Sequence, residues 1–152
     1  MLATGDTAPE FTAIDQQGNE LTLASLLAKG DLILYFYPAD FTPVCTAEAC
    51  YFRDSVAELA ELDVNVVGVS PQGSDSHQRF ADRYDIPFPL IDDSSRELIR
   101  AWGVDGPLGF GVRRVTFLIG KDGVINQRAV ADLLLNSHKA LVASVLETQA
   151  DS

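Results

Sequence analysis

Three consecutive segments constrain the fold of this chain more than any other feature. Asp31 to Tyr37 is a nearly continuous apolar run, which is typical of a strand covered on both faces. From Thr42 to Leu62, apolar residues recur at spacings of three and four, which predicts an amphipathic helix. Val64 to Ser70 is a second apolar run of strand length. Strand, helix and strand at these lengths predict a βαβ unit.

The segments on either side predict shorter elements. Before the βαβ unit, Phe11 to Ile14 and Glu20 to Thr22 flank a glycine turn and predict a hairpin, followed by a short helix from Leu23 to Ala28. After it, the sequence predicts a helix that Ser74 or Asp75 caps and that ends at Tyr84. The remaining predicted elements are an extended piece at Leu90–Ile91, a helix from about Arg96 to Trp102, a hairpin of Arg114–Ile119 with Val124–Ala131, and a last helix from Ser137 to Thr148.

This order predicts an α/β fold with a central mixed sheet that is flanked by helices. It resembles the thioredoxin fold, with an N-terminal β-hairpin and an insertion around residues 71–102 added. A length of 152 residues suits one domain, so we expect residues 1–152 to form a single unit.

Charge and hydropathy exclude several classes of function. The formal net charge of −11 argues against binding to nucleic acid or to an anionic membrane surface, since both require basic patches. No segment reaches the ~20 apolar residues that span a bilayer, and residues 1–6 show no signal-peptide pattern, so we expect a cytoplasmic protein. The acidic, lysine-poor composition fits either a high-salt cytoplasm or ordinary solubility.

The chain contains two cysteines, Cys45 and Cys50. A permanent structural disulfide is uncommon in a cytosolic protein. A structural zinc site needs about four ligands, and the spacing of the cysteines with His77 and His138 matches no zinc pattern, so we expect no metal and no cofactor. Two interpretations remain, a pair of inert buried thiols or a working redox pair.

The position of Cys45 favours the redox pair. A turn of eight residues, Pro38-Ala39-Asp40-Phe41-Thr42-Pro43-Val44-Cys45, leads from the first strand into the main helix. A thiol at a helix start meets the positive end of the helix dipole and unpaired backbone N–H groups, both of which favour the nucleophilic thiolate. Cys50, five residues later, gives an oxidised sulfur a local partner.

Four neighbouring residues have two interpretations each. The Thr42 hydroxyl either caps the helix or bonds a substrate oxygen. Glu48 either stabilises the first turns of the helix or orients an arginine. Arg113 and Arg114 open a strand, and because successive strand residues point to opposite faces, at most one of them faces Cys45. An arginine there would stabilise a thiolate and a developing oxyanion, whereas elsewhere it would be a surface residue.

These motifs resemble those of peroxiredoxins. The turn from Pro38 to Cys45 matches their P-x-x-x-T-x-x-C signature, and Arg114-Val115-Thr116-Phe117 resembles their R-x-T-F strand. The close cysteine pair resembles the bacterioferritin-comigratory or Q-type subfamily, in which the resolving cysteine lies five residues after the peroxidatic one. The resemblance extends from Gly5–Phe11 to the last helix.

The resemblance implies a thiol peroxidase without metal or cofactor. Hydrogen peroxide or an alkyl hydroperoxide would be the substrate, thioredoxin or a similar dithiol would be the reductant, and the protein would act as a monomer. It also implies a role for each matching residue: Cys45 as the nucleophile, Cys50 as the resolving cysteine, Thr42 and Arg114 as the groups that bind and polarise the peroxide, Pro38 as the shield of the pocket, and Glu48 as a supporting carboxylate.

Helix geometry adds one condition. Residues five apart in an ideal helix have Cα atoms ~8.7 Å apart, whereas a disulfide requires Cα atoms within ~7 Å. If both cysteines are helical when reduced, the first turns must unwind before they can bond.

Two rival functions stay open: a thiol–disulfide oxidoreductase, although such enzymes carry Cys-x-x-Cys, and a redox sensor that passes its disulfide to a partner protein.

Overall fold

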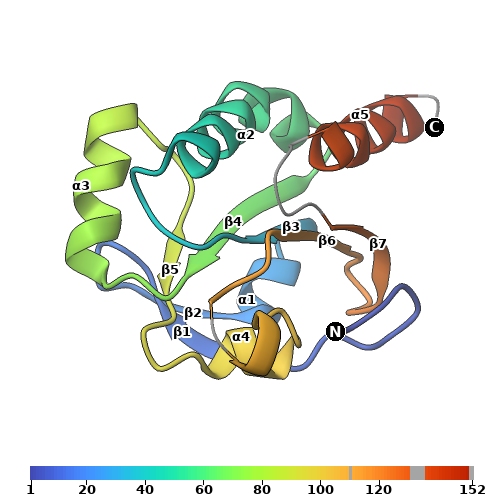
Figure 1. Ribbon diagram of the computed structural model, residues 1–152. Helices are drawn as coiled ribbons and strands as arrows, with labels where there is room; N and C mark the ends of the chain where they lie inside the picture. The colour runs from blue at the N-terminus through green and yellow to red at the C-terminus, as the bar shows by residue number, and fades with distance from the viewer. Residues whose placement is uncertain (110, 131–135, 151–152) are drawn as a thin grey trace.

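The computed structural model describes residues 1–109, 111–130 and 136–150. Its elements follow the predicted order closely (Figure 1). In chain order they are β1 (Thr12–Ile14), β2 (Glu20–Thr22), α1 (Leu23–Leu27), β3 (Asp31–Phe36), α2 (Pro43–Glu61), β4 (Val64–Ser70), α3 (Ser74–Tyr84), β5 (Leu90–Asp92), α4 (Glu97–Ala101), a 3₁₀ turn (Pro107–Gly109), β6 (Val115–Ile119), β7 (Ile125–Val130) and α5 (Asn136–Ala150).

The central sheet has the strand order β5-β4-β3-β6-β7. Strands β3, β4 and β5 run parallel, whereas β6 pairs antiparallel with both β3 and β7. The short hairpin of β1 and β2 forms a separate sheet. This arrangement confirms the predicted mixed sheet with an N-terminal hairpin.

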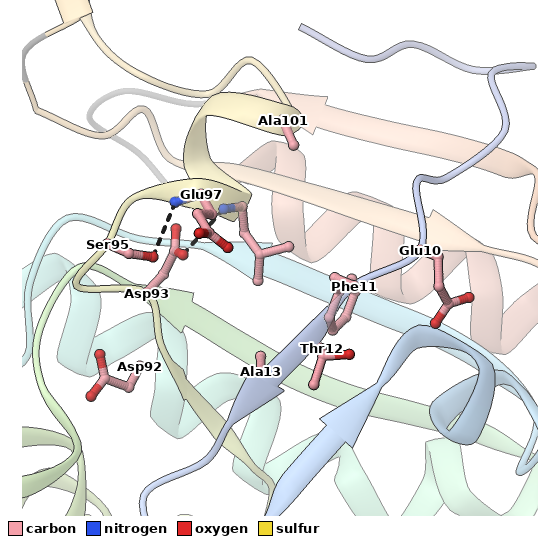
Figure 2. Close-up of a pocket in the computed structure, with 10 residues that line it drawn as sticks. Glu10, Phe11, Thr12, Ala13, Asp92, Asp93, Ser95, Glu97 and Ala101 are labelled. Atoms are coloured by element: carbon pink, nitrogen blue, oxygen red, sulfur yellow. Dashed lines mark hydrogen bonds between the residues drawn. The ribbon is translucent and has the colours of Figure 1, made fainter.

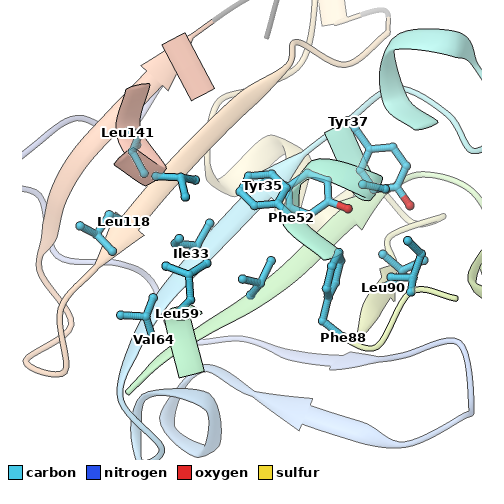
Figure 3. Close-up of a cluster of buried hydrophobic side chains, with 14 of the residues drawn as sticks. Ile33, Tyr35, Tyr37, Phe52, Leu59, Val64, Phe88, Leu90, Leu118 and Leu141 are labelled. Carbon is cyan, nitrogen blue, oxygen red and sulfur yellow. The ribbon is translucent and has the colours of Figure 1, made fainter. Parts of the chain in front are cut away.

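Helices cover both faces of the central sheet (Figure 1). Alternate residues of β3 and its extension divide between two cores, as the period of two in a strand requires. Ile33, Tyr35 and Tyr37 belong to the core under α2, α3 and α5, which Figure 3 shows. Leu32, Leu34 and Phe36 belong to the second core, together with residues of α1 and α4. All six side chains are at most 1% exposed, which explains why the sequence of β3 is almost uniformly apolar.

Two details differ from the prediction. The N-cap of α3 is Gly73, so the prediction of Ser74 or Asp75 was wrong. The acceptor comes from a neighbouring strand instead, because the Ser74 backbone N–H donates to Asp92 Oδ2 at 3.0 Å. Strand β6 begins one residue after Arg114. The predicted strand end at Ala131 lies outside the described residues.

Candidate active site

The loop that leads from β3 into α2 takes an unusual backbone turn. Phe41 has a φ of 65°, a left-handed conformation that costs a residue other than glycine roughly 1–2 kcal/mol. Its ring packs edge-on against Phe80 of α3, with centroids 5.2 Å apart, and also lies near Tyr84. The loop is therefore held in a strained shape by contacts with α3.

Thr42 occupies the N-cap position of α2, but its side chain makes no capping hydrogen bond. The Thr42 hydroxyl instead donates to the Ala39 carbonyl at 3.2 Å, within the loop. The Thr42 hydroxyl therefore does not cap the helix, which was one of its two interpretations. Pro38, half-buried, lies two residues beyond the end of β3 at the other end of the same loop.

Cys45 lies in the first turn of α2, as predicted. Pro43 is the first helical residue, and the first helical hydrogen bond runs from the Thr46 N–H to the Thr42 carbonyl at 2.8 Å. The N–H groups of Val44 and Cys45 thus precede the hydrogen-bonded part of the helix and contribute to its positive end. The Cys45 side chain is buried, with 1% exposure.

Arg114, directly before strand β6, reaches two residues of α2, Cys45 and Glu48. Its Nη1 lies 3.2 Å from Cys45 Sγ and 3.1 Å from Glu48 Oε1. All three residues are at most 6% exposed, so water screens these charges poorly. Glu48 therefore forms an ion pair with Arg114, the contact that the interpretation of this carboxylate as orienting an arginine requires.

Burial and charge act in opposite directions on Arg114. Burial alone would lower the pKa of its guanidinium, but the Glu48 carboxylate and the Cys45 sulfur outweigh this and raise that pKa above its ordinary value. Arg114 thus remains a cation beside the sulfur. A cation at this distance stabilises a thiolate over a thiol.

Arg113 lies elsewhere, although neither arginine belongs to the strand that the sequence predicts for them, because β6 begins at Val115. Its backbone N–H donates to the Val104 carbonyl at 2.7 Å, and the residue lines a separate pocket with Asp105, Gly106 and Pro107. Arg114, one position later, is the arginine that reaches Cys45.

Cys50 also belongs to α2 and is partly exposed. Both cysteines are free thiols. Since both are helical, ideal geometry separates their Cα atoms by ~8.7 Å and directs them to different sides of the helix. The structure thus fulfils the condition under which a disulfide requires unwinding.

A buried polar cluster lies behind the loop, and sequence reasoning missed it. Asp40 accepts hydrogen bonds from the Tyr37 and Ser76 hydroxyls, each at 2.7 Å, and its Oδ2 lies 2.7 Å from His77 Nδ1. In the sequence alone, His77 stands out only as a possible metal ligand. Among the described residues, no group of three or more His, Cys, Asp or Glu side chains could hold a metal ion.

Tyr35 forms the floor of this region in the first core. Its ring stacks on Phe52 and Tyr37, with centroids 4.6 and 5.4 Å away, and its buried hydroxyl has no hydrogen-bond partner among the described residues. Burial raises the pKa of Tyr35 well above its ordinary value, and the nearby charge of Glu48 adds to this effect. The phenol therefore stays neutral beside the site.

A pocket of about 370 Å³ lies on the opposite face of the sheet (Figure 2). Its lining includes Phe11 and Leu98, which belong to the second core, whereas Cys45 belongs to the first. The carboxylate of Asp93 in this pocket accepts the Leu98 and Ile99 N–H groups at 3.1 and 2.9 Å. This carboxylate thus anchors the start of α4 and has no contact with the thiol site.

No helix in the described ranges is long and apolar enough to cross a membrane.

Comparison with known proteins agrees with this geometry. Residues 4–128 match the AhpC/TSA family. The chain is 42% identical over 126 residues to the chloroplastic peroxiredoxin Q of Sedum lineare, which covers 82% of this chain and 67% of that protein.

Two solved structures show the same fold. The crystal structure of peroxidoxin BcpB from Mycobacterium tuberculosis has a TM-score of 0.90 and 34% identity, with 97% of this chain and 98% of that chain covered. The bacterioferritin comigratory protein of Xanthomonas campestris, whose structures concern its alkyl peroxide reduction activity, has a TM-score of 0.83 and 29% identity, with 92% of each chain covered. With the match to residues 4–128 and these relatives, the chain belongs to the AhpC/TSA family, among peroxiredoxins of the Q or bacterioferritin-comigratory type.

Proposed function

We propose that this protein reduces hydrogen peroxide and alkyl hydroperoxides through Cys45, with Cys50 as the resolving cysteine and thioredoxin as the reductant. One observation carries the proposal: Arg114 Nη1 lies 3.2 Å from Cys45 Sγ at the start of a helix, in a buried site that Glu48 completes. This arrangement suits a sulfur nucleophile that must be charged before it attacks.

In the first step, the Cys45 thiolate attacks one oxygen of the peroxide. The O–O bond breaks, Cys45 becomes a sulfenic acid, and the other oxygen leaves with the bonding electrons and takes up a proton as water or an alcohol. Charge builds on that leaving oxygen in the transition state. Preorganised donors aimed at it lower the barrier.

Three groups would supply those donors. The backbone N–H groups at the start of α2 belong to the same turn as Cys45, and the Thr42 hydroxyl lies in the adjoining loop. The buried Nε–H of Arg114 has no hydrogen-bond partner among the described residues, which leaves a donor for a peroxide oxygen. Pro38 would shield the pocket from water at the other end of the loop.

In the second step, the Cys50 sulfur attacks the Cys45 sulfenic acid. An S–S bond forms, the S–O bond breaks, and the oxygen leaves as water. The helical positions of both cysteines support a local unwinding of α2 before this step.

In the third step, a thioredoxin-type dithiol exchanges with the Cys45–Cys50 disulfide, so that both cysteines return to thiols and the reductant becomes a disulfide. In this cycle the protein acts as a monomer, with residues 1–152 as a single domain. A cytoplasmic location stays a prediction.

The experiment is a stopped-flow measurement of the reduced protein with hydrogen peroxide and with a bulky alkyl hydroperoxide. We expect rapid consumption of one equivalent of peroxide per chain, followed by a Cys45–Cys50 disulfide that thioredoxin reduces. Cys45→Ser should abolish both. A simple dithiol oxidoreductase would consume peroxide slowly, and a redox sensor would form one dominant mixed disulfide without turnover; either result would refute the proposal.

A further inference from the structure

The contacts of His77 require one proton more than a neutral imidazole beside a carboxylate provides. His77 Nε2 lies 2.9 Å from the Ile91 carbonyl, and since a carbonyl can only accept, Nε2 must carry a hydrogen. A neutral imidazole then has no hydrogen on Nδ1. Nδ1 nevertheless lies 2.7 Å from Asp40 Oδ2, a distance typical of a strong hydrogen bond.

One additional proton resolves this conflict. It lies either on Nδ1, which makes an imidazolium–carboxylate pair, or on Asp40, which makes a carboxylic acid that donates to a neutral ring. Without it, a lone pair and a carboxylate would face each other where both side chains are fully buried. The Tyr37 and Ser76 hydroxyls also donate to Asp40 and give its oxygens further partners.

The pair joins the active-site loop to α3. Asp40 lies in the middle of the loop, two residues before Thr42, and His77 lies in the first turns of α3. In Figure 1 the chain leaves β3, runs toward α3 and then turns back into α2. Phe41, next to Asp40, holds the left-handed conformation that such an anchor must maintain.

We infer that Asp40 and His77 share a buried proton and act as a positioning pair, which fixes the loop so that Thr42 and the start of α2 stand correctly for peroxide attack. This inference rests on the proposed attack by Cys45. The pair does not contact the sulfur in the structure and acts through the loop. Its loss should slow the first oxidation and leave the later formation of the disulfide unslowed, because disulfide formation requires the helix start to unwind.

The shared proton can be tested in the unaltered protein. Nuclear magnetic resonance of the ¹⁵N-labelled reduced protein at neutral pH should show two hydrogen-bonded protons at the His77 ring. One is the Nε2 proton, and the other lies strongly downfield in the hydrogen bond between Nδ1 and Asp40, whether it is bonded to Nδ1 or to the carboxyl oxygen. His138→Gln assigns the signals, because the chain contains two histidines. A His77 ring with a single hydrogen-bonded proton would overturn the inference, whatever the peroxide chemistry of the protein.

The positioning role can be tested by stopped-flow kinetics. Asp40→Ala should slow Cys45 oxidation by at least about 10-fold, since a shift of ~1 Å in a catalytic group can cost up to about 100-fold. Asp40→Asn should recover most of that loss, because its amide can donate to the neutral Nδ1 while its carbonyl accepts from Tyr37. Gln78→Ala, which removes an exposed hydrogen bond from Gln78 to Asp82 within α3, is the matched control.

The outcomes distinguish the proposed peroxidase function from the positioning role of Asp40 and His77. If the parent protein reacts slowly with peroxide, the proposed function is wrong, while the shared proton is still decided by resonance. If the parent reacts rapidly and Asp40→Ala equals it, the positioning role is wrong. If Asp40→Ala fails to fold, Asp40→Asn decides: a loss of 10-fold or more in that folded variant would contradict the inference, and a rate near the parent's together with the shared proton would support it.

Discussion

Arg114→Ala tests the central contact of the site. In the structure, Arg114 Nη1 lies 3.2 Å from Cys45 Sγ, and at the effective dielectric constant of ~20 found in proteins two unit charges at this distance attract by about 5 kcal/mol. Part of this attraction offsets the cost of burying both charges. The expected loss is therefore smaller than the full attraction and matches the loss of one oxyanion donor. The rate of peroxide attack should decrease by roughly 100-fold or more.

The same substitution should also destabilise the fold, for a separate reason. Glu48, 1% exposed, would lose the cation 3.1 Å from its carboxylate. A buried charge without its partner costs about 3–5 kcal/mol. Urea denaturation of Arg114→Ala should show a loss of this size, and the double variant Arg114→Ala/Glu48→Gln should recover most of it.

The double variant separates catalysis from stability. Its rate of peroxide attack should remain roughly 100-fold low, because an amide in place of Glu48 restores no cation beside the sulfur. Stopped-flow oxidation of the reduced protein measures this rate, and Arg113→Ala, which alters the neighbouring arginine in a different pocket, is the matched control. If the double variant regained the parent rate, Arg114 would have only a structural role and the reasoning would be refuted.

Three further predictions follow from the same contacts. Cys50→Ser should keep a rapid first oxidation but lose steady turnover with thioredoxin and accumulate sulfinic acid in excess peroxide, measured by mass spectrometry; unchanged turnover would mean that the reductant attacks the sulfenic acid directly. Disulfide formation should increase amide exchange from about Thr42 to Arg53 and leave β4 protected, and an unchanged exchange pattern would contradict the unwinding. Burial raises the pKa of Tyr35 above the ~10 of a free phenol, so ionisation of this phenol in the unfolded chain lowers the stability of the fold as the pH rises above about 10. Tyr35→Phe should therefore move alkaline unfolding to higher pH and stabilise the protein by ~1 kcal/mol, whereas an unchanged alkaline midpoint would argue against it.

Local sequence patterns were sufficient for most of the fold. The apolar run of β3 and the amphipathic period of α2 each follow from residues that are neighbours in sequence, and the order of the elements then fixed the mixed sheet. Strand alternation also indicated that only one of Arg113 and Arg114 could face Cys45. Such features depend on backbone periodicity, which a single sequence displays directly.

Features that depend on residues far apart in the sequence could not be predicted from local sequence patterns. Asp40 and His77 are 37 residues apart and become partners only because α3 packs against the loop. The cap of α3 comes from Asp92, 18 residues after Ser74, so the local polar residues misled the prediction. In both cases the fold supplies a hydrogen-bond acceptor that local propensity does not anticipate.

The structure also indicates why the unwinding can stay local. Phe52 is fully buried in the first core, and Arg53 Nη1 donates to the Tyr84 carbonyl at 2.7 Å, so α2 is anchored to the sheet and to α3 from that point onward. On the other side, Asp40 anchors the loop. The turns between these anchors bury mainly small side chains such as Cys45 and Ala49, whose exposure costs little hydrophobic free energy compared with a phenylalanine.

On the proposed cycle, the chemistry itself would weaken the one strong contact inside that stretch. Before oxidation, the Arg114 guanidinium faces a thiolate and the Glu48 carboxylate, and both attractions hold the helix start in place. Oxidation converts the thiolate into a neutral sulfenic acid, so the attraction between Arg114 and the sulfur loses most of its strength. The helix start therefore becomes easier to unwind only after peroxide has reacted, and Cys50 can reach Cys45 at the stage when a disulfide is useful.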